Sequence, residues 1–341
     1  MKKKFNLLQI DLLKGIAIIF VLIFHTLPRE TLDGIYFDFH IRQAVPIFIL
    51  LLGLNMGMSF ARQKFELNIG NIKKYLQNRF WRIIFPFLVL FFTTLLIGIA
   101  TSRIKIYGIL GKILLGIFGV LPIYGPGNYF ITILFQFILV FPLIFWLYRK
   151  YPKLTVVLCF SIDILFQIFA KNSDIFDNFP YLYSACILRY LSIISIGLWL
   201  STDFKLFSRR NFFILLGSII SIAYLIAVDF YSYIFPYFRN VWHTVLAFFY
   251  PALIVCIGIN HLPKKAENMI IEWFKQIGKT SYHIFLFQIA FFGFGLNAYA
   301  YTEPILAIIT NIIICLIGGI LFMLFEKRLK YVLTNRNTTT K

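Results

Sequence analysis

Long apolar runs, separated by short polar and often basic segments, fill almost the whole chain. The runs are about 18–22 residues long, which is the length that a helix needs to cross about 30 Å of hydrocarbon. Because lipid cannot hydrogen-bond to a backbone, each run is predicted to be a helix. The pattern therefore predicts an all-α polytopic membrane protein with about ten membrane-spanning helices, at residues 7–27, 43–61, 83–101, 129–148, 154–170, 184–201, 212–230, 241–260, 280–298 and 304–325.

An eleventh apolar stretch, residues 108–122, is shorter and rich in glycine. We predict a short re-entrant or interfacial segment here, and a true span is the alternative. A span would reverse the side of every later loop and place the basic pairs outside, at Arg149, Lys150, Arg209 and Arg210. Cytoplasmic loops of membrane proteins are the ones that collect Lys and Arg, so the first interpretation is favoured.

Basic residues outnumber acidic residues, 33 to 14, which gives a formal net charge of +19. In a soluble protein such an excess would indicate a nucleic-acid partner. Here 60% of the residues are hydrophobic, against roughly 45–50% in soluble proteins. Most of the basic residues also fall in the loops that alternate spans leave on one side of the membrane. The positive-inside rule therefore explains the charge, and we expect no nucleic-acid partner and both chain ends in the cytoplasm.

Nothing in the pattern divides the chain into soluble domains. We predict one integral membrane domain over residues 1–333 and a polar tail over residues 334–341. Lys2, Lys3 and Lys4 precede the first apolar run, as in a signal peptide, but no small-residue cleavage site follows. We therefore expect a retained first helix.

The two longest basic loops, residues 62–82 and 261–279, have the pattern of short amphipathic helices. Asn68 or Asn71 would cap the first of these helices, and Pro263 would start the second. Gln136, inside the fourth span, is expected to hydrogen-bond to another helix.

The first span carries three ionisable side chains, Asp11, Lys14 and His25. Asp11 and Lys14 are one helical turn apart and can pair. Eleven residues separate Lys14 from His25, and this is about 20° past three full turns, so the three side chains share one face. His25 lies about 16 Å further along the helix axis, toward the outer leaflet.

Two interpretations of this face remain open. In the first, Asp11 and Lys14 mark the entrance of the helix and His25 lies in headgroup water. In the second, the buried charges form a functional site, because ionisable groups inside a span are costly. His25 would then act as a general base or carry the acyl group of a transfer reaction, since an imidazole titrates near neutral pH.

A second basic constellation, Arg79-Phe-Trp-Arg82, precedes the third span and is followed by Pro86. Arg79 and Arg82 are three residues apart and share a helix face at the cytoplasmic boundary. Guanidinium groups bind phosphates bidentately, so a phosphate-bearing cofactor is one interpretation. Plain positive-inside anchoring is the other.

Several enzyme classes leave no trace in the sequence. There is no P-loop, no Gly-x-Ser-x-Gly and no His-Glu-x-x-His motif, so the signatures of phosphate-loop enzymes, serine hydrolases and zinc proteases are missing. The four cysteines lie within or at the edge of apolar runs and form no Cys-x-x-Cys pair. We expect them to be small buried hydrophobic residues, and we predict no metal site.

The ordered set of motifs resembles the acyltransferase-3 family of integral membrane O-acyltransferases. Members begin with a helix that reads roughly Asp-x-x-Arg-Gly, then apolar residues, then His, with ten residues between the basic residue and the His. Asp11, Lys14 and His25 have that layout. The Arg79-Phe-Trp-Arg82 segment is similar to the family's Arg-x-x-Arg element.

Five further segments are similar to family motifs, and together they extend the resemblance over essentially the whole chain. They are residues 45–53, 127–131, 141–142, 278–288 (Gly-Lys-Thr-Ser-Tyr-His-Ile-Phe-Leu-Phe-Gln) and 325–327. Three positions depart from the pattern: Lys14 stands in place of Arg, Leu52 in place of Ser, and Gln288 in place of His.

The resemblance implies transfer of an acyl group, usually acetyl from cytoplasmic acetyl-CoA, to a hydroxyl of a cell-surface or lipid-linked glycan. It implies acyl-CoA, a glycan or lipid-linked saccharide, and membrane lipid as partners, and the bacterial cytoplasmic membrane as the location. His25, Asp11 and Lys14 would be the catalytic residues. Arg79 and Arg82 would bind the phosphates of coenzyme A.

Other functions compete with this one. A transporter or flippase for a polysaccharide or lipid-linked sugar would share the basic loops and buried charges, but the sequence has no inverted repeat. A glycan polymerase would have a large outer loop, whereas residues 102–128 are modest in length and mostly apolar. A catalytically inactive partner protein is a further alternative, given Leu52 and Gln288.

Overall fold

The computed structural model describes residues 7–336, which form helices and connecting loops without a β-strand. Lys2, Lys3 and Lys4 and most of the predicted polar tail, residues 337–341, lie outside the described residues. The last helix, α15 (Pro304–Arg336), continues through residues 334–336, the first three residues of the predicted polar tail. The predicted all-α polytopic architecture is confirmed.

Nine helical segments within residues 7–336 are long and apolar enough to cross a membrane. They contain α1 (Leu8–Thr26), α3 (Ala44–Arg62), α4 (Ile69–Arg79) with α5 (Phe85–Ala100), α7 (Tyr129–Lys150), α8 (Pro152–Lys171), α10 (Pro180–Ser184) with α11 (Leu191–Leu200), α12 (Phe212–Tyr231), α14 (Met269–Gly293) and α15 (Pro304–Arg336). Short helices occupy the loops: α2 (Arg29–Asp33), η1 (Phe37–Phe39), η2 (Ile41–Gln43), η4 (Ile106–Gly108), α9 (Asp174–Asn178) and η6 (Ala298–Ala300).

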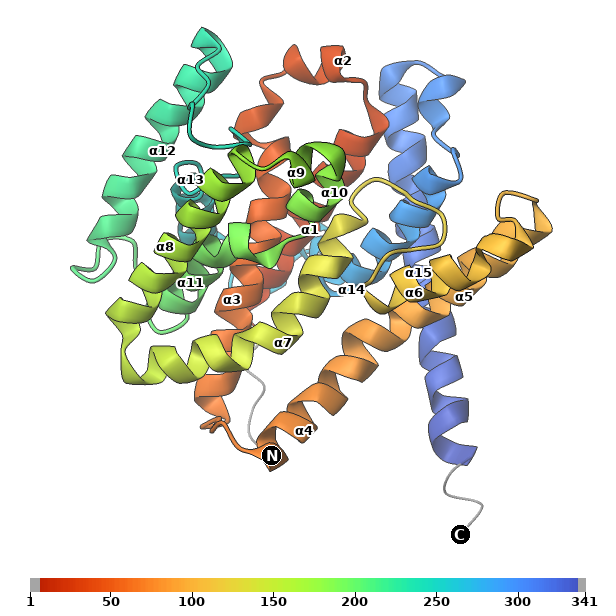
Figure 1. Ribbon diagram of the computed structural model, residues 1–341, viewed down its shortest axis with the longest axis horizontal. Helices are drawn as coiled ribbons and strands as arrows, with labels where there is room; N and C mark the ends of the chain where they lie inside the picture. The colour runs from red at the N-terminus through yellow and green to blue at the C-terminus, as the bar shows by residue number, and fades with distance from the viewer. Residues whose placement is uncertain (1–6, 337–341) are drawn as a thin grey trace.

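The span expected at residues 241–260 is shorter than predicted, because α13 covers only Phe249–His261. The preceding residues, 232–248, form no helix. Figure 1 shows α1 beginning and α15 ending at the same side of the molecule, which we call the terminal side. At 13 residues, α13 is shorter than the nine helical segments that are long enough to cross a membrane.

The span expected at residues 184–201 is broken rather than continuous. The chain is extended at Cys186, and the turn η5 (Ile187–Tyr190) joins α10 to α11. Gln136 of α7 makes this break possible, since its amide donates to the Ala185 carbonyl over 2.7 Å and accepts from the Ile187 amide over 3.0 Å. Irregular backbone at membrane depth is tolerated only when such partners satisfy it. The predicted interhelical role of Gln136 is therefore confirmed.

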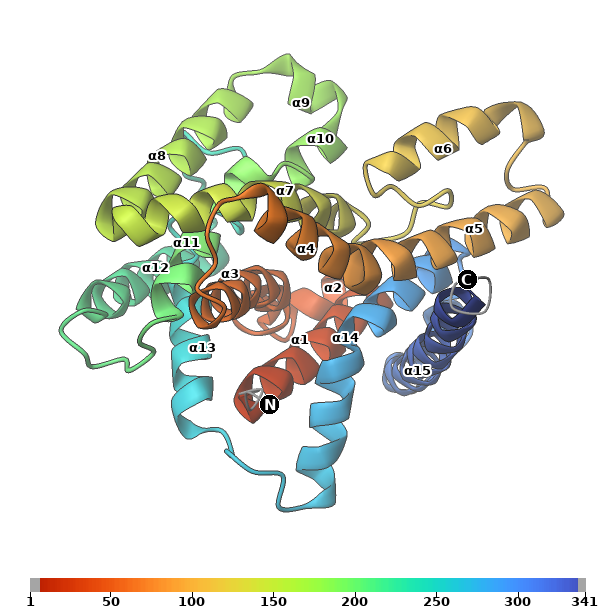
Figure 2. The same ribbon diagram turned by 90° about the horizontal axis from the view of Figure 1, so that it is seen from below.

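The glycine-rich stretch at residues 108–122 is not a span. Its helix, α6 (Ile109–Ile117), has 9 residues, or about 14 Å of length against about 30 Å of hydrocarbon. Most of its large apolar side chains are exposed, and Gly116 packs against Phe91 of α5. The helix lies beside α5 at the edge of the bundle (Figure 2).

The two longest basic loops, residues 62–82 and 261–279, contain helices as predicted, but only the first begins where expected. Asn68 caps α4 by accepting a hydrogen bond of 2.9 Å from the Asn71 amide. The second helix starts later than expected, at Met269 instead of Pro263, because Asn268 supplies the cap. Neither amphipathic helix is separate from the span that follows it. Helix α4 continues through the π-helical turn η3 (Phe80–Ile84) into α5, and α14 covers much of both the second amphipathic segment and the ninth expected span.

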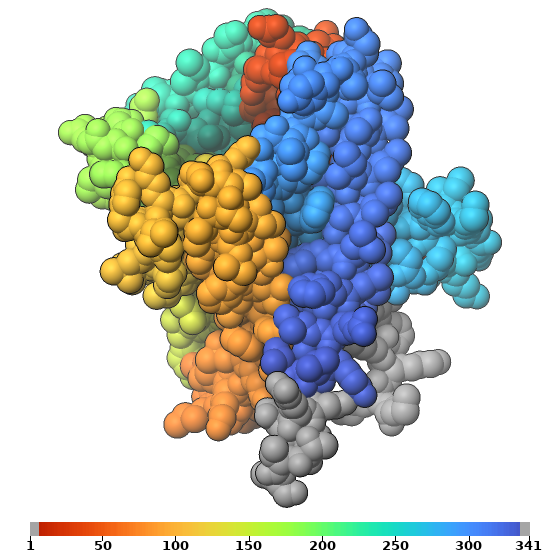
Figure 3. Space-filling model, turned by 90° about the vertical axis from the view of Figure 1, so that its right-hand side faces the viewer, coloured from red at the N-terminus to blue at the C-terminus, as the bar shows by residue number. Residues whose placement is uncertain are grey.

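Close helix–helix contacts hold the centre of the bundle together. Helix α1 packs along α14, and a Cβ atom on Gly278 would lie 1.7 Å from the Asp11 carbonyl oxygen. Helix α3 packs in the same way on α11, where Gly53 and Gly197 leave no room for a side chain. Small residues let helices approach closely in a lipid environment, where dispersion forces rather than hydrophobicity drive association. Figure 3 shows α15 running along the outer surface beside α5.

Candidate active site

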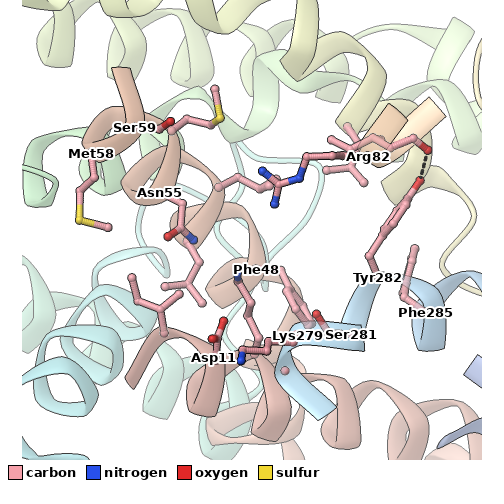
Figure 4. A pocket seen from close by; sticks show the side chains of 18 of the residues that line it. Asp11, Phe48, Asn55, Met58, Ser59, Arg82, Lys279, Ser281, Tyr282 and Phe285 are labelled. Atoms are coloured by element: carbon pink, nitrogen blue, oxygen red, sulfur yellow. Dashed lines mark hydrogen bonds between the residues drawn. The ribbon is translucent and has the colours of Figure 1, made fainter. Parts of the chain in front are cut away.

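A cavity of about 400 Å³ opens on the terminal side, between α1, α3, α14 and the junction of α4 with α5. Figure 4 shows Asp11 and Lys279 on one side of it, Arg82 and Tyr282 on another, and Asn55 and Ser59 on the α3 wall. With α7, which also lines the cavity, five segments that are far apart in the sequence contribute to one site.

Positive charge dominates this cavity. Five of the lining side chains are basic and one, Asp11, is acidic; the basic residues are Lys14, Arg62, Arg79, Arg82 and Lys279. Asp11 and Lys14 form none of the ion pairs found among residues 7–336. The direct pairing expected from their spacing is therefore absent, and Asp11 instead lies within electrostatic reach of Lys14, Lys275 and Lys279 together. A site with this imbalance is suited to an anion.

The π-helical turn at the α4–α5 junction positions the two arginines. Pro86 lacks an N–H, so the regular hydrogen-bond ladder cannot run through this point, and π-helical turns are frequent at functional sites. The hydroxyl of Tyr282 donates a hydrogen bond of 2.8 Å to the Ile83 carbonyl, which ties the turn to α14 (Figure 4). Arg79 lies half-buried over the ring of Tyr75, and its Nε has no hydrogen-bond partner within residues 7–336.

Gly278 explains how α14 brings its polar side chains to the site. Because no side chain separates the two backbones at this residue, the next turn of α14 lies directly beside the Asp11 turn of α1. Lys279, Ser281 and Tyr282 then line the cavity. Gly15 of α1 makes a second close contact, since a Cβ atom added there would lie 2.6 Å from the Phe274 carbonyl oxygen.

The deeper wall of the cavity is aromatic. Phe48 of α3, Phe130 of α7 and Phe285 of α14 all line it. The ring centroids are 6.2 Å apart for Phe48 and Phe130, and 5.2 Å apart for Phe130 and Phe285. The cavity thus combines a basic entrance with an apolar interior, as is common for sites that bind cofactors with charged and apolar parts.

His25 does not line this cavity. Its ring contacts Phe24 and Phe292, with centroids 5.2 and 6.2 Å away, at the end of α1 far from the terminal side. The backbone here is held in place, because the Asn297 amide donates to the carbonyls of His25 and Thr26. The structure therefore brings together four of the five predicted site residues and leaves His25 apart from them.

Sequence reasoning missed several polar residues of the cavity. Lys279 and Tyr282 lie within a segment that resembles a family motif, and their spacing of three residues on one helix face was the available signal. Asn55 and Ser59, four residues apart on an otherwise apolar helix, carry the same signal. Leu52, which departs from the family pattern, lines the cavity.

Gln288, the other departure on α14, lies outside the cavity. It is fully buried and donates to the Pro126 carbonyl over 3.3 Å, so it fixes the loop before α7. Within residues 7–336 no three His, Cys, Asp or Glu side chains gather as a metal site would require.

Comparison with known families agrees with the motif pattern. The family model Acyl_transf_3, described as an acyltransferase domain, matches residues 7–325, nearly the whole chain. No curated protein and no solved structure matches the chain in the corresponding comparisons. With its membrane-spanning helices, the chain belongs to the acyltransferase-3 family and is a membrane acyltransferase.

Proposed function

We propose that the protein is an O-acyltransferase that takes an acyl group, most simply acetyl, from cytoplasmic acyl-CoA and transfers it to a hydroxyl of a cell-surface or lipid-linked glycan. The observation that carries the proposal is the cavity itself, in which five basic side chains from four segments surround one carboxylate. Coenzyme A has several phosphate charges at one end and a long, weakly polar arm that bears the thioester at the other.

The phosphates of the donor fit the basic entrance. Arg79 and Arg82 supply guanidinium forks that bind phosphate oxygens bidentately, and Lys279 adds a point charge from the facing helix. In this arrangement the terminal side faces the cytoplasm, where acyl-CoA is made.

The arm of the donor fits the aromatic wall formed by Phe48, Phe130 and Phe285. It would then point along α1, toward the end of the helix that carries His25. About 16 Å of helix separates Lys14 from His25, so one side chain cannot stabilise an oxyanion while the other deprotonates the attacking hydroxyl. We therefore assign Asp11 and Lys14 to holding and orienting the donor.

His25 carries the acyl-transfer step in this proposal. As general base, its neutral imidazole takes the proton of the acceptor hydroxyl while the hydroxyl oxygen attacks the thioester carbonyl. The carbon–sulfur bond then breaks and CoA leaves as a thiolate that takes up a proton. As acyl carrier, a ring nitrogen attacks first, CoA leaves, and the hydroxyl attacks the acyl-imidazole in a second step. Both routes give the same ester and free CoA.

The experiment uses the purified full chain in nanodiscs with radiolabelled acetyl-CoA and scores CoA release and transferred label. Wild type is compared with His25→Ala and with the double variant Arg79→Gln/Arg82→Gln. The matched control is Lys264→Gln/Lys265→Gln, which removes two exposed charges from the loop between α13 and α14.

We expect His25→Ala to bind acetyl-CoA and transfer no label. The arginine variant should need at least about tenfold more acetyl-CoA, because each charge-assisted hydrogen bond contributes about 1.5–3 kcal/mol. The Lys264/Lys265 control should match wild type. If wild type neither binds nor consumes acetyl-CoA or longer acyl-CoAs, the choice of donor is wrong. Movement of a glycan across the membrane that survives loss of His25 would favour the transporter function instead.

A further inference from the structure

A second cavity lies on the terminal side, behind the last turn of α3. It has a volume of about 830 Å³ and shares no lining residue with the candidate active site. Its walls are the end of α7, the start of α8 and the loop from α11 to α12, and Ala61 of α3 also lines it. A site of this size can hold a polar headgroup.

Four basic side chains line this second cavity: Arg149, Lys150, Lys153 and Arg210. None of them takes part in the ion pairs found among residues 7–336, and no acidic side chain lines the cavity. Asp203, in the loop from α11 to α12, accepts a hydrogen bond of 3.0 Å from the Lys205 amide. That hydrogen bond, with help from the charge of Arg210, holds the pKa of Asp203 below its ordinary value. One carboxylate near four cations leaves the cavity with a positive charge.

Three of the cations are held in place by other groups. Arg210 donates to the Tyr148 hydroxyl over 2.9 Å and to the Trp199 carbonyl over 2.8 Å, and it lies over the Trp199 ring at 4.3 Å. Arg149 donates to the Phe65 carbonyl over 2.8 Å. The Lys150 ammonium lies 4.4 Å from the centre of the Trp146 ring. Binding an anion here would therefore require little ordering of side chains.

The rim of the cavity is apolar and faces outward. Tyr151 and Leu154 line the cavity and are 57% and 49% exposed, and Val157, one turn further along α8, is 60% exposed. In a membrane-spanning helix such exposed apolar side chains face lipid. The basic cavity thus opens at the level where acyl chains meet headgroups.

We propose that this cavity binds the phosphate of an anionic phospholipid from the leaflet on the terminal side. Basic pockets between membrane helices recognise such headgroups, and the lipid tails would lie along the exposed face of α8. The apolar rim favours a lipid over free phosphate, because free phosphate has no part that would contact Leu154 or Val157. The inference does not depend on the proposed acyl donor or acceptor.

The test is native mass spectrometry and thermal unfolding of the delipidated full chain in detergent. Dioleoyl phosphatidylglycerol is titrated in, with dioleoyl phosphatidylcholine and inorganic phosphate as parallel probes. The test variant is Lys150→Gln/Lys153→Gln, and Lys150→Arg/Lys153→Arg keeps the charge. The control is Lys264→Gln/Lys265→Gln, which removes the same charge from the loop between α13 and α14.

We expect wild type to bind phosphatidylglycerol more tightly than phosphatidylcholine and to gain thermal stability from it. The glutamine variant should bind about thirtyfold more weakly, since each surface lysine contributes roughly fivefold. The arginine variant and the control should keep the affinity. Equal binding of both lipids to wild type overturns the proposal, as does an equal loss in the control variant. Stabilisation by inorganic phosphate without lipid would overturn the choice of a phospholipid.

Discussion

The contact between α1 and α14 at Gly278 offers the sharpest test of how the candidate site is built. A Cβ atom there would lie 1.7 Å from the Asp11 carbonyl oxygen and 2.6 Å from its carbon, and both are backbone atoms that cannot rotate away. Ordinary contact needs about 3.5 Å. Gly278→Ala therefore forces the two helices apart by about 2 Å at the turn that carries Asp11.

Two effects follow from that displacement. Overpacking of this kind costs about 1–3 kcal/mol of stability, so the temperature of thermal unfolding should fall. Lys279 and Tyr282 would also move away from Asp11 and Lys14, and a misplacement of about 1 Å at a site lowers activity by about 100-fold. Gly15→Ala should have a smaller effect on both measurements, because its Cβ would lie 2.6 Å from the Phe274 carbonyl oxygen.

The assay measures acyl-CoA consumption and thermal unfolding of the purified variants in the same detergent. Gly111→Ala is the matched control, because a Cβ at Gly111 in α6 would meet nothing within 4 Å. We expect this control variant to keep wild-type activity and to have an unfolding temperature equal to or slightly above that of wild type. If Gly278→Ala and Gly111→Ala have the same activity and the same unfolding temperature, the close packing of α1 on α14 is refuted.

Two hydrogen-bond variants test the cavity and the region around His25 separately. Tyr282→Phe removes the hydrogen bond of 2.8 Å to the Ile83 carbonyl, so we expect a loss of about 1 kcal/mol in stability. We also expect a raised KM for acyl-CoA with little change in kcat. An unchanged KM would show that Tyr282 has no role in donor binding. Asn311→Ala removes hydrogen bonds to Thr26, Asn297 and the Ala298 amide, which hold the end of α1 that carries His25. We expect kcat to fall while the Kd for acyl-CoA, measured by calorimetry, stays at the wild-type value, and a weakened Kd with normal kcat would contradict this positioning role.

Much of the fold follows from the sequence alone. The apolar runs predict the position of most spans within a few residues. A run must be long enough to cross the hydrocarbon core, and its backbone N–H and C=O groups must hydrogen-bond within the run, so it forms a helix. The short length and glycine content of residues 108–122 likewise argue against a crossing. The motif order identified the family that the whole-chain comparison then confirmed.

Helix periodicity also placed part of the candidate site correctly. Asp11 and Lys14 share a helix face, and so do Arg79 and Arg82, and all four line one cavity. That the two pairs meet is a property of the tertiary structure, since α1 and α4 are joined by two loops and a span. The tertiary structure also brings Lys275 and Lys279 of α14 near the Asp11 carboxylate, which helix periodicity alone could not predict.

Only the tertiary structure decided where helices break and how closely they pack. The interruption at Cys186 depends on the amide of Gln136 from another helix, and the first amide of α13, that of Phe249, donates to the Ser221 hydroxyl of α12 over 3.2 Å. The sequence alone determined which residues carry charge and where along a helix each one lies. Which of them face one cavity is set by backbone contacts such as that of Gly278 with Asp11, because these fix the position of one helix against another.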